Sequence, residues 1–195
     1  MLDSVLTRLE DALERATPKT IDNPALVPAG VLVLLYLKNG EPHLLLNKRS
    51  ESVESHKGEI SFPGGRKDLS DDSLVDTALR ETYEEIGVNP DDVRVLGEMD
   101  EIDTMTGYRV SPFLGTISER YRFIVNRLEV AELIEVPLFG LMKGALVRDE
   151  MRQIEGNWVR RNNYSYNGHL IWGATARIVN RLLVLLQPEF DKEPT

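Results

Sequence analysis

Three glutamates stand close together in the segment 80–87, which reads RETYEEIG. On a helix, Glu81, Glu84 and Glu85 occupy positions i, i+3 and i+4, so their carboxylates share one face. Like charges at that spacing destabilise a helix unless a cation compensates them. Oxygen ligands gathered in this way suit Mg²⁺ or Mn²⁺, hard ions that also take phosphate oxygens from a substrate. The triplet alone is equally typical of a solvated acidic surface, so the neighbouring sequence has to decide.

A basic segment precedes these glutamates in a chain that is acidic overall. Residues 48–72 are polar, lack a clear periodicity and contain the run Pro63-Gly64-Gly65. Two adjacent glycines let the backbone approach a ligand closely and point its amides toward it. Cationic side chains that can hold phosphates are Arg49, His56, Lys57, Arg66 and Lys67. The double glycine, the basic loop and the acidic helix together predict a metal-assisted phosphate site.

The segment from Gly65 to Val88 resembles the Nudix box, G-x5-E-x7-R-E-U-x-E-E-x-G-U. Its first glycine stands one residue early, Asp72 replaces the first glutamate, and Thr82 occupies the first hydrophobic position. The REx2EExG core is intact. The resemblance implies a Nudix-type α/β (α+β) fold, in which a mixed β-sheet is sandwiched between α-helices. It also implies that Mg²⁺ or Mn²⁺ is the cofactor and that the metal ligands are Glu81, Glu84 and Glu85.

The loop ahead of the box resembles a narrower pattern, LLTxRSxxLxxHxGxISFPGGxxD, which marks Nudix coenzyme A pyrophosphatases. The match runs over 44–68, with Asn47 in the place of Thr and Val53 in the place of Leu. Residues 106–112 and 171–176 also resemble segments of that subfamily. The resemblance implies that coenzyme A or acyl-CoA is hydrolysed to 3′,5′-ADP and (acyl-)4′-phosphopantetheine. It further implies that the substrate is bound by Arg49, His56, Gly64, Gly65 and Arg66.

The catalytic roles are expected to fall on Glu84, Glu85 and a further acid outside the box. In Nudix enzymes the general base is often a glutamate on a later loop, for which Glu129 is the candidate, with Glu101 and Glu98 as alternatives. His56 is expected to support the substrate or the loop and not to act as the general base, because a lone histidine is more often structural than catalytic. Phe62 is expected to anchor the loop and not to stack on adenine. Possible walls of a pantetheine channel, each more commonly a core residue, are Tyr108, Phe113, Trp158 and Trp172.

Two other readings stay open. The first is a Nudix pyrophosphatase for ADP-ribose, nucleotide sugars or nucleoside triphosphates, which only the loop pattern separates from a coenzyme A enzyme. The second is a Nudix-fold module that binds a nucleotide or a protein without chemistry. The second predicts a box that lacks its metal ligands, whereas Glu81, Glu84 and Glu85 are all present.

Local patterns predict the elements that position these residues within one domain over 1–195. An amphipathic helix is expected over 2–16, followed by a proline-rich connector over 17–28. Asn39-Gly40, between apolar runs, predicts a hairpin whose loop is slightly longer than minimal. Ser73 and Gly87 are expected to cap the carboxylate helix. Strands are expected at 31–37, 43–47, 93–99, 108–117, 121–125 and 145–154, and helices at 138–142 and 174–186.

Composition narrows the classes of partner. The 195 residues carry a formal charge of −9, which argues against broad binding to nucleic acid or anionic membranes. The absence of cysteine excludes a thiolate nucleophile and a disulfide framework. No apolar run approaches the ~20 residues of a membrane helix, and the acidic amphipathic N-terminus does not fit a targeting peptide. A cytoplasmic protein with a small nucleotide-like substrate is expected, as a monomer or a homodimer.

Overall fold

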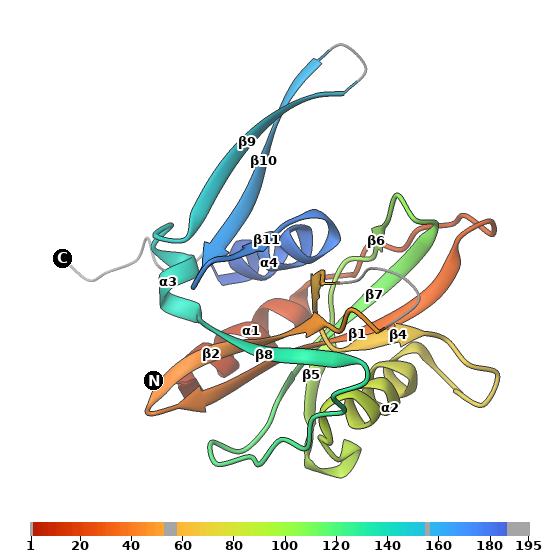
Figure 1. Cartoon of the computed structure of the whole chain (residues 1–195), viewed down its shortest axis with the longest axis vertical. Helices are drawn as coiled ribbons and strands as arrows, with labels where there is room; N and C mark the ends of the chain where they lie inside the picture. The colour runs from red at the N-terminus through yellow and green to blue at the C-terminus, as the bar shows by residue number, and fades with distance from the viewer. Residues whose placement is uncertain (1, 53–57, 155–156, 187–195) are drawn as a thin grey trace.

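The computed structural model describes residues 2–52, 58–154 and 157–186, and its centre is a mixed β-sheet (Figure 1). The strands of this sheet are β1 (Val27–Lys38), β2 (Glu41–Arg49), β3 (Ile60–Ser61), β4 (Gly64–Arg66), β5 (Arg94–Glu98), β6 (Ile102–Asp103), β7 (Tyr108–Thr116) and β8 (Val130–Pro137). They follow the order β3-β2-β1-β7-β5, with β4, β6 and β8 paired to β1, β7 and β2. β1 and β7 run parallel, and the other pairs are antiparallel.

Helices cover both faces of this sheet. The helices of the described residues are α1 (Leu2–Arg15), α2 (Leu74–Ile86), α3 (Leu138–Met142), α4 (Gly173–Leu186) and a 3-10 turn, η1 (Pro90–Asp92). Along β1, Val33 and Leu35 join the apolar cluster beneath α1 and α4, whereas Leu32 and Leu34 join the cluster beneath α2. Burial on both faces explains why β1 is continuously apolar. The structure confirms the predicted mixed sheet between helices.

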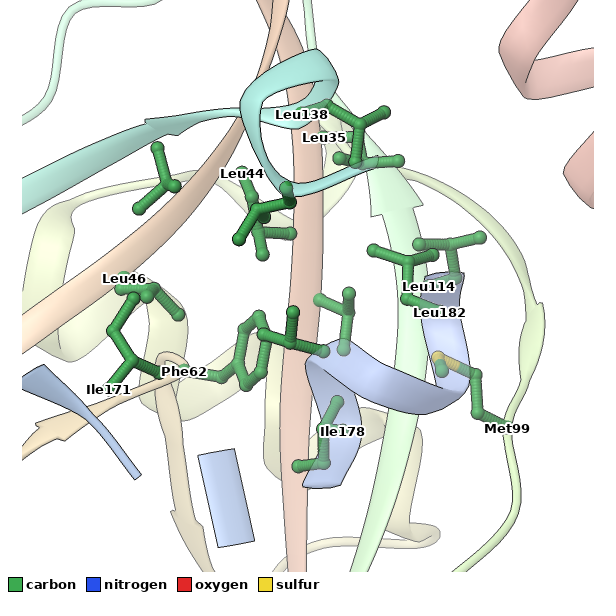
Figure 2. Packing of buried hydrophobic residues seen from close by; sticks show 14 of the residues in the cluster. Leu35, Leu44, Leu46, Phe62, Met99, Leu114, Leu138, Ile171, Ile178 and Leu182 are labelled. Carbon is green, nitrogen blue, oxygen red and sulfur yellow. The ribbon is translucent and has the colours of Figure 1, made fainter. Parts of the chain in front are cut away.

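The larger cluster lies between the sheet and the two terminal helices. Figure 2 shows Leu182 of α4 beside Leu114 of β7, and Ile178 of α4 belongs to the same cluster. α1 contributes an apolar stripe whose members are all buried, namely Leu2, Val5, Leu6, Leu9 and Leu13. This helix ends at Arg15, one residue before the predicted limit, and β1 includes Val27 and Pro28 from the expected connector. The parallel pairing of β1 with β7 begins at Val27, so Val27 and Pro28 belong to the sheet and not to the connector.

The hairpin between β1 and β2 is tighter than predicted. Lys38 pairs with Glu41, which leaves Asn39 and Gly40 as a two-residue turn. Both turn residues have positive φ, +53° and +80°, as a type I′ turn requires. The expectation of a longer loop was wrong because the strand pairing continues through the polar residues that flank the turn.

A second sheet of three strands lies at the C-terminal end of the chain. It consists of β9 (Val147–Ile154), β10 (Asn157–Tyr166) and β11 (His169–Ile171). The β9–β10 hairpin projects away from the body of the molecule in Figure 1. Its base is anchored by Tyr164, which is buried and donates its hydroxyl proton to Asn180 Oδ1 of α4 at 3.2 Å. In the part of the chain that the structure describes, no helix is long and apolar enough to cross a membrane.

Candidate active site

Helix α2 begins and ends where its local sequence predicts. The Ser73 side chain accepts a hydrogen bond from the Asp76 N–H, and Asp76 accepts one from the Ser73 N–H, which completes a capping box. Gly87 adopts the left-handed conformation, and its N–H donates to the Tyr83 carbonyl at 2.8 Å. Thr82 is buried and donates its hydroxyl to the Ala78 carbonyl at 2.6 Å, which lets a polar residue occupy a hydrophobic position of the box.

Glu85 is a buried carboxylate at the centre of the candidate site, with only 3% of its surface exposed. Its Oε2 accepts hydrogen bonds from Asn47 Nδ2 at 2.8 Å and from the Gly64 N–H at 3.1 Å. Arg49 Nη1 lies 3.7 Å from the other oxygen. Burial raises the pKa of Glu85 to about 8, against the opposing effects of Gly64 and Arg49. A cation bound beside this carboxyl would favour its ionised form.

Gly64 and Gly65 are required by close contacts within the protein. A Cβ on Gly64 would lie 2.3 Å from the Gly30 carbonyl oxygen, and Gly64 has a φ of +142°. A Cβ on Gly65 would lie 2.5 to 2.7 Å from the carboxyl group of Glu81. Burial raises the pKa of Glu81, and a hydrogen bond from Arg80 opposes that rise. The double glycine therefore lets β4 pass directly beneath the acidic face of α2.

Arg80 holds the loop and the helix together through Asp71. Arg80 Nε and Nη2 donate to the two oxygens of Asp71 at 2.8 and 2.9 Å, which is a bidentate pair. Those hydrogen bonds hold the pKa of Asp71 well below its usual range. Asp72, which the spacing assigned to the box, is exposed. Asp71, which keeps the usual five-residue spacing from Gly65, is the acid that pairs with Arg80.

Replacing Asp71 with asparagine is expected to lower the free energy of unfolding by about 2–3 kcal/mol at pH 7, because Arg80 loses a buried partner. Since the pKa of Asp71 is lowered in the folded state, its contribution to stability is present above the unfolded value near 3.8 and is lost at lower pH. Denaturant unfolding of both proteins from pH 7 to pH 2.5 measures this. The difference should shrink by about 1.4 kcal/mol per pH unit below about 3.8. A pH-independent difference would contradict the assigned pair.

The three box glutamates occupy different environments. Arg80 Nη1 donates to Glu81 Oε1 at 2.9 Å and to Glu84 Oε2 at 3.2 Å, and Glu84 is exposed. Within residues 2–52, 58–154 and 157–186, no three acidic or histidine side chains already surround one metal position. The donors nevertheless fit a hard divalent ion, because they are all carboxylates and Glu85 is buried. Asn47 Oδ1 adds a buried oxygen that lacks a hydrogen-bond partner beside Glu85.

Glu129 lies near the box carboxylates, as its negative charge contributes to the raised pKa of both Glu81 and Glu85. It precedes β8, and its carbonyl accepts a hydrogen bond from the Ser50 N–H at 2.7 Å. The two alternative candidates for the general base, Glu101 and Glu98, make different contacts. Glu101 is buried and accepts hydrogen bonds from the Ile21 N–H at 2.6 Å and from the Ser111 hydroxyl at 2.7 Å. Glu101 therefore ties the N-terminal connector to β7.

Glu98, the last alternative for the general base, and the predicted phosphate-binding cations lie in different parts of the structure. Glu98 lines a pocket between α1 and α4, and burial and the Glu101 charge raise its pKa. Of the predicted substrate-binding cations, Arg49 lies beside Glu85, and Arg66 is exposed. Lys67 Nζ donates to the Asp72 carbonyl at 3.4 Å. Outside the described residues lie two further predicted cations, His56 and Lys57.

The aromatic residues proposed as channel walls mostly serve the fold. Phe113 is buried in the cluster beneath α2, and Tyr108 packs against the larger cluster. Trp172 is 46% exposed, and the side chain of Trp158 lies outside the described part. Phe62 is 2% exposed within the larger cluster, so it anchors the loop (Figure 2). Ordinary burial therefore accounts for Phe113 and Phe62, as expected.

Comparison with known proteins agrees with this geometry. The model of the NUDIX domain matches residues 27–172. Two bacterial relatives, each named an uncharacterized Nudix hydrolase NudL, come from Pectobacterium atrosepticum and Yersinia enterocolitica. The first is 41% identical over 143 residues, covering 72% of this chain and 73% of the relative. The second is 39% identical over 144 residues, covering 73% of each chain.

Two solved structures share the fold. A MutT/nudix family protein from Enterococcus faecalis superposes with a TM-score of 0.53 at 17% identity, covering all of this chain and 72% of the other. A binary complex of the Ap4A hydrolase of Caenorhabditis elegans gives a TM-score of 0.50 at 17% identity, covering 59% of this chain and 83% of the other. From the domain match, the sequence relatives and the acidic helix beside the double glycine, we conclude that the chain belongs to the Nudix family.

Proposed function

We propose that this Nudix pyrophosphohydrolase cleaves coenzyme A or acyl-CoA to 3′,5′-ADP and (acyl-)4′-phosphopantetheine. The family acts on nucleoside diphosphate derivatives, and the finer assignment comes from the loop over 44–68. One observation carries it: three residues of that loop surround the buried carboxylate of Glu85. Arg49 and Gly64 match the pattern, and Asn47 stands where the pattern has Thr. The segment that resembles coenzyme A pyrophosphatases therefore contributes directly to the environment of the box.

In the proposed mechanism, Glu81, Glu84 and Glu85 would hold Mg²⁺ or Mn²⁺, and the ion would neutralise charge on the diphosphate and lower the pKa of the attacking water. Glu129 accepts the proton of the attacking water as its oxygen forms a bond to phosphorus and the bridging P–O bond breaks. Arg49 supports this by balancing the charge of Glu85, and its Nε has no hydrogen-bond partner within the protein among the described residues. Arg66 and His56 bind the substrate phosphates beside Gly64 and Gly65, while the Gly64 N–H stays bonded to Glu85 Oε2.

A substrate panel tests this proposal. Purified protein is incubated with Mg²⁺ or Mn²⁺ and with coenzyme A, acetyl-CoA, ADP-ribose, a nucleotide sugar and a nucleoside triphosphate, and products are identified by chromatography. We expect the highest kcat/KM for a coenzyme A compound, with 3′,5′-ADP as a product. A large excess of kcat/KM for ADP-ribose would reject the substrate assignment and keep the Nudix chemistry.

The same panel addresses a non-catalytic module. Tight nucleotide binding in calorimetry, without hydrolysis under either metal, would favour that reading over an enzyme. The intact set of Glu81, Glu84 and Glu85 supports the enzyme. A cytoplasmic location and a monomeric or homodimeric state stay predictions.

A further inference from the structure

The segment that precedes β8 attaches to the end of the box helix through its backbone. The Ile124 N–H donates to the Ile86 carbonyl at 2.9 Å, and the Asn126 N–H donates to the Glu85 carbonyl at 2.9 Å. These are carbonyls of the last turn of α2, which have no partner within the helix. The segment is therefore bonded to the backbone of Glu85, whose carboxylate lies in the site.

Gly87 makes this attachment possible. A Cβ at Gly87 would lie 2.7 Å from Ile124 Cβ and 3.0 Å from the Ile124 carbonyl oxygen. The residue also has a φ of +71°, which L side chains rarely adopt. The final glycine of the box thus ends the helix and leaves room for the chain that leads to Glu129.

Asn126 uses both its backbone and its side chain to shape the approach to Glu129. Its carbonyl accepts hydrogen bonds from the Glu129 N–H at 3.1 Å and the Val130 N–H at 2.9 Å. Its Oδ1 accepts one from the Leu128 N–H at 3.2 Å. Its Nδ2 donates to Glu129 Oε1 at 3.2 Å. One residue therefore links the backbone of Glu85 to the carboxylate of Glu129.

The hydrogen bond to the carboxylate matters because of the surrounding charge. Glu129 lies close enough to Glu81 and Glu85 for electrostatic repulsion between the three acids. Repulsion favours rotation of the Glu129 side chain away from the site. The Asn126 amide is a neutral donor that opposes this rotation, whereas a cation there would compete as a partner for the box glutamates.

We propose that Asn126 is a positioning residue that holds the Glu129 carboxylate toward the box and sets its distance from Glu85. This inference rests on the proposed function, in which Glu129 takes the proton from water. It extends that function by assigning the residue that fixes the position of the general base relative to the box helix.

The test variant is Asn126→Asp, which is nearly isosteric. It keeps an oxygen to accept the Leu128 N–H but replaces the donor to Glu129 with a second negative charge. We expect kcat to fall by about 10- to 100-fold with little change in KM, because the substrate contacts are intact. The matched control is Asn23→Asp, since Asn23 Oδ1 accepts the Ala25 N–H in an exposed turn of the N-terminal connector. This control should keep kcat and the melting temperature.

Combination with Glu129→Gln distinguishes positioning from a general loss of structure. If Asn126 acts through Glu129, Asn126→Asp should lower kcat by less than about twofold in the Glu129→Gln background. Multiplicative losses, or an Asn126→Asp variant equal to Asn23→Asp, would overturn the inference, as would a Glu129→Gln variant with unchanged kcat. The assay uses the panel substrate that the wild type hydrolyses fastest. A wild type that hydrolyses none of them rejects the proposed function itself, which separates the two failures.

Discussion

Replacing Glu85 with glutamine is expected to abolish measurable turnover while the protein stays folded. The amide oxygen can still accept the hydrogen bonds from Asn47 and the Gly64 N–H, so the local structure is retained. The variant loses the negative oxygen that holds a divalent ion. A loss of several kcal/mol of charge stabilisation corresponds to about a 10³-fold or larger fall in kcat. Steady-state kinetics with saturating Mg²⁺ or Mn²⁺ measures this.

The melting temperature of the metal-free Glu85→Gln variant should equal or exceed that of the wild type. Burial raises the pKa of Glu85 to about 8, so folding at neutral pH carries the free-energy cost of protonating this carboxyl group, and a glutamine does not have that cost. The matched control is Glu14→Gln on the exposed side of α1, which should change neither kcat nor stability. A Glu85→Gln enzyme with near-normal kcat would reject the proposed ligand set.

Replacing Gly65 with alanine is expected to lower kcat/KM by about 100-fold with a small change in stability. The new Cβ would occupy the space of the Glu81 carboxyl group, at 2.5 Å from its carbon. The end of that side chain can move, so the fold adapts while the ligand leaves its position. Kinetics and a thermal melt of the same preparation measure the two effects separately.

The neighbouring variant Gly64→Ala provides the contrast. Its Cβ would collide with the backbone of β1, at 2.3 Å from the Gly30 carbonyl oxygen and 2.6 Å from Val31 Cα. The backbone cannot move as a side chain can, so this variant should lose at least about 4 kcal/mol of stability or fail to fold. If Gly65→Ala proved as unstable as Gly64→Ala, the assigned contact with Glu81 would be wrong.

Sequence prediction succeeded where the interactions are local. The limits of α2 were correct because Ser73 and Gly87 satisfy backbone groups within a few residues of themselves. The expected helices over 138–142 and 174–186 are present as α3 and α4. The β1–β2 hairpin was located by Asn39-Gly40, although its exact loop length depended on the register of the strands.

Prediction failed where an element depends on distant partners. The alternating apolar residues at 121–125 predicted a strand, and they form none. The alternation itself is real, because Tyr121 and Phe123 pack beneath α2 and Phe123 contacts Tyr36 edge to face. The N–H groups of this part of the chain bind the end of α2 instead of a neighbouring strand. Conversely, the strand β8 was missed, although it pairs with β2 over most of its length.

The sequence by itself determined the acidic helix, its caps and its resemblance to the Nudix box, because those features lie within about one helix length of each other. Only the tertiary structure decided which acid pairs with Arg80 and which later glutamate approaches the box. Asp71 pairs with Arg80, and Glu129 lies near Glu81 and Glu85, whereas Glu101 is bonded to Ile21 and Ser111. Those choices depend on side-chain direction and on pairing between segments far apart in the chain, which residue spacing does not specify.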